Sequence, residues 1–316
     1  MKKFVAILLT LMLVLGMTAA VAEETTDTTT ATIKKLYKLT NADTTSPEET
    51  FTLVQTAKSV KNGEATTAPD LDTITGASFA AGAATVDGLT GDITVALPEY
   101  DTVGVYEYIL REVAGTTAGV AYYGNDIKLV VTVVNGENGK LRVAAVHTEG
   151  KDETKNDTFT NIYSAGKLNI TKTVTGNLGD KSKYFEFKVT LTGETGKTYG
   201  ETYAVSGGSY DTNPTSIKIG EETTFMLKHG DTISIANLPY GVTYSVTETA
   251  ADGYTTTKTG DTGSINAAET TAAFTNSKTG TIDTGVTTES LPYVVLMGFV
   301  VLAGAALLLK RKAHNN

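Results

Sequence analysis

Residues 159–172 read FTNIYSAGKLNITK, and this stretch joins two β patterns. Phe159 and Asn161 end the first pattern, and because side chains alternate along a strand, they lie on one strand face. Lys172 shares a face with the apolar residues that open the second pattern, Leu168, Ile170 and Val174. An amide therefore points inward at the end of one domain, and an amine points inward at the start of the next. Lysine is rarely buried unless it is paired.

The same inward polar residues occur twice, in the same order. Each half of the chain has an inward lysine on its first strand, an inward glutamate on a late strand and an asparagine on its last. The two sets are Lys35, Glu112 and Asn161, then Lys172, Glu248 and Asn276. Lysine and glutamate are separated by 77 and 76 residues, and glutamate and asparagine by 49 and 28. A predicted hairpin at 127–146 accounts for the longer interval, so the pattern indicates a two-copy internal repeat, in which Lys34 competes with Lys35.

The composition favours an all-β protein. The 316 residues suffice for about two domains. Threonine and valine are abundant in segments where apolar and polar residues alternate, and glycine is abundant at the predicted turns, as is typical of β-strands. There is no cysteine, which excludes disulfides and thiolate chemistry, and no tryptophan. The net charge of −9 and the lack of a dense basic stripe argue against nucleic acid as a partner.

Alternating apolar residues and turn residues predict two β-sandwiches in tandem, with no long helix in either. In the first domain, residues 31–163, we expect strands at 31–39, 51–54, 103–112, 127–134, 141–146 and 159–161, with loops and short strands at 57–95. In the second, residues 164–279, we expect strands at 167–175, 184–192, 222–227, 232–236, 244–248 and 270–276, with turns at 228–231 and 237–241.

The N-terminus has the pattern of a secretory signal. Two lysines precede an apolar stretch that ends in the small-residue site Ala20-Val21-Ala22. We expect residues 1–22 to be a signal peptide cleaved between Ala22 and Glu23, rather than a retained anchor. Residues 23–30 then form an acidic, threonine-rich leader that is flexible or extended.

The C-terminal segment, residues 280–316, has four parts. The motif 281–285 reads TIDTG and is followed by a short spacer at 286–290. An apolar run at 291–309 is long enough to span a bilayer, and a basic tail follows at 310–312. This order resembles a Gram-positive cell-wall sorting signal, in which a sortase cuts between threonine and glycine, here Thr284 and Gly285. Thr281 and Ile282 replace the Leu and Pro of the common motif. An uncleaved membrane anchor is the alternative.

The body of the chain is similar to streptococcal-type backbone pilins with self-generated isopeptide bonds. The segments that carry this resemblance are LNITKTVTG at 168–176, FMLKHG at 225–230, LPYGVTYSVTE at 238–248 and FTN at 274–276, with GVYEY at 104–108 and FTN at 159–161 in the first domain. The resemblance implies Ig-like (CnaB-type) sandwiches, a covalent homopolymer built by a pilus sortase, and location at the Gram-positive cell wall. Minor pilins and peptidoglycan are further implied partners.

The repeated triplets have a chemistry of their own. An apolar core disfavours both the ammonium and the carboxylate, so a buried pair can exist as neutral amine and neutral acid. The amine can then attack the asparagine amide, which the glutamate polarises through its oxygen, and ammonia leaves. We expect bonds from Lys35 to Asn161 and from Lys172 to Asn276, with Glu112 and Glu248 as the catalytic groups. A buried ion pair beside a hydrogen-bonded asparagine is the alternative. The reaction occurs once on the protein itself, so the chain is not an enzyme.

A covalent polymer also needs an acceptor lysine, which in related pilins lies just before the last strand of the first domain. Lys155 is the preferred candidate and Lys151 the alternative; either is also compatible with an ordinary solvated lysine. His147, His229 and His314 lack ligand spacing and are interpreted as surface residues, so no metal or cofactor is expected. The leading function is a pilus shaft subunit, and the alternative is a monomeric wall-anchored adhesin or stalk.

Overall fold

The computed structural model describes residues 27–281 and Met297. Within residues 27–281 the protein is built of β-strands, with one short 3-10 helix at Glu137–Gly139, so the all-β prediction is confirmed. No helix in the described part is long and apolar enough to cross a membrane. The predicted cleavage sites at Ala22–Glu23 and Thr284–Gly285 lie outside the described residues, as does the predicted span apart from Met297.

Domain one, the N-terminal unit, has two main sheets. The first has the order β4 (Ile74–Thr75), β6 (Leu89–Ala96), β1 (Thr30–Leu39), β11 (Thr158–Tyr163) and β8 (Val120–Ala121). The second has the order β10 (Leu141–Glu149), β9 (Ile127–Asn135), β7 (Gly104–Glu112) and β3 (Leu53–Gly63). A small ribbon pairs β2 (Glu49–Phe51) with β5 (Ala77–Phe79).

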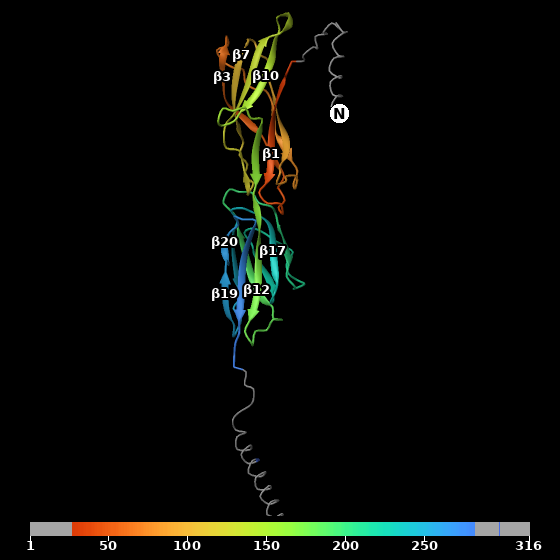
Figure 1. The fold of residues 1–316 in the computed structure, drawn as a ribbon, viewed down its shortest axis with the longest axis vertical. Coiled ribbons are helices and arrows are strands. Elements are labelled where there is room, and N and C mark those ends of the chain that lie inside the picture. The colour runs from red at the N-terminus through yellow and green to blue at the C-terminus, as the bar shows by residue number, and fades with distance from the viewer. Residues whose placement is uncertain (1–26, 282–296, 298–316) are drawn as a thin grey trace, which may run out of the picture.

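Domain two follows the same plan, and it lies end to end with domain one (Figure 1). Its larger sheet has the order β15 (Ser216–Ile217), β14 (Tyr203–Gly207), β17 (Thr232–Pro239), β12 (Ala165–Thr175), β21 (Glu269–Ser277) and β19 (Thr255–Thr259). The smaller sheet has the order β16 (Glu222–Leu227), β13 (Phe185–Thr192), β18 (Thr243–Glu248) and β20 (Thr262–Ser264).

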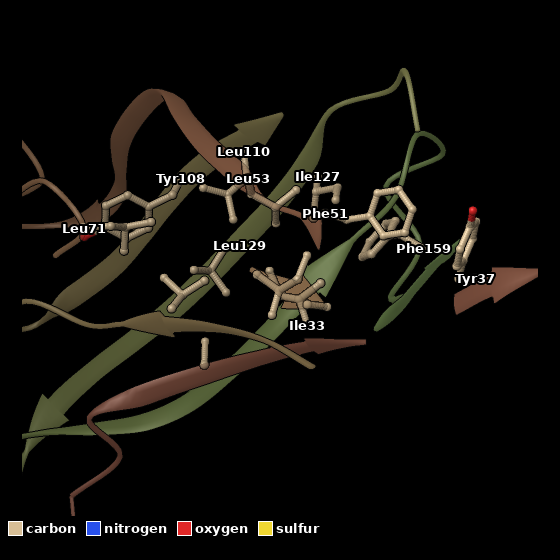
Figure 2. Close-up of a cluster of buried hydrophobic side chains, with 14 of the residues drawn as sticks. Ile33, Tyr37, Phe51, Leu53, Leu71, Tyr108, Leu110, Ile127, Leu129 and Phe159 are labelled. Atoms are coloured by element: carbon tan, nitrogen blue, oxygen red, sulfur yellow. The ribbon is translucent and has the colours of Figure 1, made fainter. Parts of the chain in front are cut away.

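Each domain has its own hydrophobic core. Figure 2 shows the core of domain one, where Ile33, Phe159 and Leu129 come from both sheets and pack together. A second cluster in domain two includes Ile170, Phe187 and Phe274. Because apolar side chains occupy every second position of the inner strands, each sheet buries one face and leaves the other to solvent.

The predicted strands with strong apolar alternation are present, and the differences occur where this alternation is weak. The predicted turn at 237–241 is partly strand, since β17 continues to Pro239. The region 57–95 contains the end of β3, all of β4 and β5, and all of β6 except its last residue, Ala96. Strands β8, β14, β15, β19 and β20 were not predicted. All five side chains of β19 are exposed, so no apolar pattern marks it.

The first and last long strands of each domain are neighbours and run parallel. In domain one β1 pairs with β11, and in domain two β12 pairs with β21. The chain therefore enters each domain at one end and leaves it at the other (Figure 1). A pulling force along the molecule shears these two strands against each other.

The joint between the domains, residues 162–171, is short, and residues on either side of it form hydrogen bonds from one domain to the other. Only Ser164 separates β11 from β12. The side chain of Asn237 accepts a bond from Thr45 N at 2.9 Å and donates one to Thr45 O at 3.0 Å, from the opposite domain. Backbone bonds of 2.8 and 2.9 Å also connect Thr198 in domain two to Thr116 and Ala118 in domain one. The joint is thus a clamped contact rather than a free linker.

Candidate functional site

The strand register places lysine and asparagine in the same way in both domains. Lys35 lies opposite Phe159 in the β1–β11 ladder, and Asn161 is two residues further along β11. Lys172 lies opposite Phe274 in the β12–β21 ladder, and Asn276 is again two residues further. Because side chains two apart share a face, each lysine and asparagine project together into the core from adjacent strands.

The glutamate of each set comes from the other sheet. Glu112 is the last residue of β7 and Glu248 the last residue of β18. Both strands belong to the sheet that faces the lysine and the asparagine across the core. Each candidate site is therefore closed only when the two sheets of its sandwich have packed.

In domain two a single carboxylate connects both nitrogen atoms. The Lys172 amine donates to Glu248 Oε1 at 2.8 Å and to Oε2 at 2.7 Å. The amide nitrogen of Asn276 donates to the same Oε1 at 2.5 Å. The nucleophile expected from the sequence and the leaving nitrogen thus contact one acid group.

Domain one repeats this arrangement around Glu112. The Lys35 amine is paired with Glu112 Oε2, and the Asn161 amide nitrogen donates to Oε1 at 2.6 Å. Oε1 also accepts a bond from the backbone N–H of Tyr123 at 3.2 Å. Lys34, the competing residue, points to the surface and forms an ion pair with Asp92 at 2.7 Å. The geometry therefore favours Lys35 over Lys34.

Both lysines are buried together with their glutamate partners. Their side chains are at most 1% exposed, and those of Glu112 and Glu248 are 0% and 3% exposed. Burial lowers the pKa of the Lys35 and Lys172 amines below the usual value of 10.5, and the neighbouring glutamate opposes this effect. Burial thus increases the fraction of each amine that is neutral, and the neutral amine is the nucleophilic form.

Aromatic rings enclose each amine. The Lys172 Nζ lies 4.3 Å from the ring centre of Phe185, and the Lys35 Nζ lies 5.3 Å from that of Phe51. The ring of Tyr123 is also near Lys35, at 5.6 Å. The sequence analysis did not assign these rings to the sites, because an aromatic residue on a strand usually indicates core packing alone.

The amide groups have an orientation that differs from the sequence-based expectation. We expected glutamate to polarise the amide oxygen, but the amide nitrogen faces the carboxylate in both domains. The Oδ1 atoms of Asn161 and Asn276 are buried and have no hydrogen-bond partner among the described residues. Rotating the amide by half a turn would exchange its Nδ2 and Oδ1 atoms, so that Oδ1 faces the glutamate. The oxygen then has a hydrogen-bond donor only if the glutamate is protonated.

A third group of the same residue types lies on the outer face of domain two. Asn169 is connected to Glu269 through its amide nitrogen, and Lys167 Nζ lies 3.3 Å from Glu269 Oε2. The side chains of Lys167 and Glu269 are 42% and 53% exposed. Water can stabilise both charges there, so this surface trio lacks the condition that distinguishes the two core sites.

The two candidate acceptor lysines lie in the segment before β11. Lys151 and Lys155 are both exposed. Lys155 forms an isolated β-bridge with Glu149 and lines a surface groove of about 480 Å³, together with Thr30, Thr32 and Val146. Lys151 is not among the residues that line this groove.

The histidines of the described chain are half-buried rather than fully exposed, which corrects the interpretation of His147 and His229 as simple surface residues. The Nδ1 of His229 accepts a bond from Val174 N at 3.0 Å, and His147 Nε2 lies 3.2 Å from Glu149 Oε1. His314 lies outside the described residues. No group of three or more potential metal ligands is found in the described part.

Two family descriptions match the chain, one on each side of Ala165. Residues 31–164 match the family described as "Spy0128-like isopeptide containing domain". Residues 166–278 match a domain family of unknown function (DUF7601).

Proteins of Streptococcus pyogenes resemble the chain in sequence. A pilin of serotype M1 is 30% identical over 235 residues, which cover 67% of this chain and 69% of that protein. A pilus tip adhesin, Cpa, is 35% identical over 131 residues, which cover 39% of this chain and only 18% of the adhesin.

The fold is also found among solved structures. The crystal structure of the major pilin from Streptococcus pyogenes superposes with a TM-score of 0.55 at 23% identity, covering 81% of this chain and all of that one. Another major pilin of this species, T3.2, gives a TM-score of 0.50 at 22% identity.

Proposed function

This chain belongs to the streptococcal-type backbone pilins, and we propose that it is the repeating shaft subunit of a sortase-assembled, wall-anchored pilus. Pilins are structural proteins of the cell surface, and the chain serves there as a load-bearing polymer unit rather than as an enzyme. Its two Ig-like (CnaB-type) domains, 31–163 and 164–279, are the rigid parts of the unit.

The observation that carries this function is the duplicated buried Lys–Glu–Asn arrangement. We infer that Lys35 bonds to Asn161 and Lys172 to Asn276. In each reaction the neutral lysine Nζ attacks the asparagine Cγ, the Nζ–Cγ bond forms and the Cγ–Nδ2 bond breaks. One proton passes from the amine to the departing nitrogen, and ammonia leaves. Atoms balance without any cofactor.

The contacts of the glutamate support its role in this proton transfer. Glu248 accepts from both Lys172 Nζ and Asn276 Nδ2, so it can take the proton from the first nitrogen and deliver it to the second. If the amide turns by half, the protonated acid instead polarises the Oδ1 atom that lacks a partner. Both pathways require the carboxyl group between the two nitrogens, and strand geometry supplies the proximity.

The bonds suit a subunit under tension. Each one would connect the parallel first and last strands of its domain, which an axial force would otherwise shear apart. If loop entropy is treated as it is for disulfides, each closure of roughly 100 residues stabilises its domain by about 5 kcal/mol. A load that enters at β12 can then cross to β21 without unfolding the residues between them.

Polymerisation requires a sortase, whose cysteine thiolate we propose attacks the carbonyl of Thr284 and releases Gly285. The Lys155 amine of a second copy then attacks the resulting thioester, an amide bond forms and the thiolate leaves. Lys151 remains the alternative acceptor. Export by a signal peptide cleaved at Ala22–Glu23 and transient anchoring through 291–309 complete this sequence, with peptidoglycan and minor pilins as further partners.

A monomeric wall-anchored adhesin or stalk is the second candidate, favoured by the matched segment of the pilus tip adhesin. Boiling a cell-wall extract in SDS separates the two functions. A shaft subunit gives a ladder of high-mass bands that resists boiling, and its ladder is lost in a strain without the pilus sortase. A single band at subunit mass would contradict the polymer and favour the adhesin.

A further inference from the structure

Strand β12 extends beyond its neighbour β17 at the end that carries Lys172. The β12–β17 ladder ends where Thr171 lies opposite Thr232, whereas β12 continues to Thr175. On its other side β12 remains paired with β21 over this whole segment. Residues 172–175 therefore need other hydrogen-bond partners on the β17 side.

The turn between β16 and β17 supplies these partners. The N–H of Lys172 donates to Asp231 O at 3.0 Å, and Lys172 O accepts from Gly230 N at 2.9 Å. The next inward residue, Val174, donates its N–H to Nδ1 of His229 at 3.0 Å. An imidazole thus continues a row of bonds that is otherwise made by backbone groups. Because Nδ1 accepts, the proton of the neutral ring is on Nε2.

This turn, residues 228–231, is itself held in place. Asp231 Oδ2 accepts from Lys228 N at 3.0 Å and from Ser209 Oγ at 2.9 Å. The backbone closes with a bond of 3.1 Å from Asp231 N to Lys228 O. The turn therefore presents His229 to β12 from a fixed position.

The residue that His229 holds lies directly beside the amide of the candidate site. In the β12–β21 ladder Val174 lies opposite Asn276, and Lys172 is two residues away on the same face. Val174 is buried, so its N–H would be costly to leave without an acceptor. If this bond were lost, the end of β12 would move more freely, and the attack of an amine on an amide depends on close and constant alignment.

We propose that His229 is a positioning residue for the Lys172–Asn276 bond, because it fixes the end of β12 on which the amine is aligned with the amide. The inference rests on the proposed isopeptide chemistry. Domain one needs no counterpart, since β6 pairs with β1 as far as Tyr37, the residue opposite Asn161. A strand backbone performs there the task that an imidazole performs in domain two.

The imidazole also makes this support sensitive to pH. Its Nδ1 can accept the Val174 N–H only while it carries no proton, and most imidazoles change charge between about pH 5 and 8. The titratable groups around the ring are Lys228 and Asp231 of its own turn, Tyr184 against Lys228, and the Lys172–Glu248 pair on β12 and β18. Protonation of His229 should therefore slow bond formation in domain two and leave domain one unaffected.

Two variants of the full chain separate the acceptor atom from the bulk of the side chain. His229→Leu keeps an apolar bulk without an acceptor, and His229→Asn, the matched control, places an amide oxygen near the position of Nδ1. After a pulse of cell-free synthesis, peptide mapping over time measures both cross-links in the same chain. We expect the domain-two bond to form about tenfold more slowly with leucine and at the wild-type rate with asparagine. An unchanged rate in domain one shows that each variant folds.

The pH profile provides a readout that packing alone would not change. From about pH 7.5 to about pH 5.5 the domain-two rate of the wild type should fall more than that of His229→Asn, since the other titratable groups are the same in both. If the domain-two bond forms equally fast in all three chains, or equally slowly with leucine and asparagine, the positioning role is wrong and the isopeptide chemistry stands.

Hydrogen exchange tests the contact apart from the reaction. In Asn276→Ala, which cannot form the bond, the Val174 amide should exchange about tenfold faster with His229→Leu than with histidine or asparagine. Equal exchange in the three chains would show that His229 does not hold β12. If the wild type forms no domain-two bond, the proposed chemistry fails and the positioning role with it, whereas exchange still decides whether His229 supports the strand.

Discussion

Lys172 and Asn276 project from the first and last strands of domain two, which lie side by side and run parallel. Lys35 and Asn161 have the same relationship in domain one. In both cases a glutamate from the facing sheet contacts the two nitrogen atoms. This duplicated geometry leads to specific expectations for bond formation, stability and rigidity.

The glutamate is the group whose removal should separate folding from bond formation. Glu248→Gln keeps the shape of the side chain but cannot accept and deliver a proton. We expect this variant to lose one ammonia molecule instead of two by intact mass, with the missing bond located in domain two by peptide mapping. Glu269→Gln, in the surface trio, is the matched control and should lose two. Loss of two by Glu248→Gln would exclude the glutamate from the chemistry.

Burial, rather than residue type, should decide which lysines react. The surface trio of Lys167, Asn169 and Glu269 has the same residue types, but its lysine and glutamate are exposed to solvent and only Asn169 is buried. We expect peptide mapping of the wild-type chain to find no bond between Lys167 and Asn169. A cross-linked peptide containing both would show that a dry core is not required.

The proposed Lys172–Asn276 bond should contribute a large part of the stability of domain two. Asn276→Ala prevents closure of the loop between residues 172 and 276 and leaves the packing of β12 against β21 nearly unchanged. We expect the free energy of unfolding of domain two to fall by about 5 kcal/mol. Chemical denaturation should show an earlier transition for domain two alone. An unchanged denaturation curve would mean that no bond forms in the wild type.

The unlinked lysine should also make stability depend on pH. In Asn276→Ala, Lys172 remains a buried amine with a pKa lowered from 10.5 by desolvation. Between that lowered value and 10.5 the unfolded chain holds a proton that the folded chain does not. Stability should therefore rise with pH across this window, by at most about 1.4 kcal/mol per unit.

The matched control for this pH dependence is the double variant Asn276→Ala with Lys172→Met, which lacks the titrating amine. Core tyrosines such as Tyr37, whose pKa is raised by burial, affect both variants equally, so the difference between them isolates Lys172. A difference that does not change with pH would contradict the buried neutral amine.

The side chain of Asn237 should contribute much of the rigidity of the joint. Asn237 has a positive φ of 57° and bonds to both backbone groups of Thr45. Asn237→Gly tolerates the same backbone conformation but removes both bonds. We expect small-angle scattering to show a wider range of interdomain angles, with both isopeptide bonds intact. Scattering identical to the wild type would assign the rigidity to the other contacts.

The core position of the six candidate residues could be predicted from the sequence better than their surroundings. Each of the six residues lies on a strand with clear apolar alternation, so its phase determined which face it occupies. Strand β19 could not be predicted because its residues are all exposed and give no periodic signal. The Asn237–Thr45 contact joins residues 192 positions apart, and a pattern read along one strand contains no information on such contacts.

The orientation of the asparagine amides was also beyond sequence reasoning. Side-chain phase places Asn161 and Asn276 in the core but does not distinguish the amide nitrogen from the oxygen. Only the packed sheets determine which atom meets the carboxylate. The choice between Lys34 and Lys35 could not be made from the sequence for the same reason. It depends on which face of β1 meets the facing sheet.

Intact mass of the mature wild-type chain tests the central claim most directly. Two self-formed bonds release two ammonia molecules, so the measured mass should be lower than the sequence mass by that amount. Digestion should then yield cross-linked peptides joining Lys35 to Asn161 and Lys172 to Asn276. A mass equal to that of the sequence, with all four residues recovered in unlinked peptides, would contradict the account.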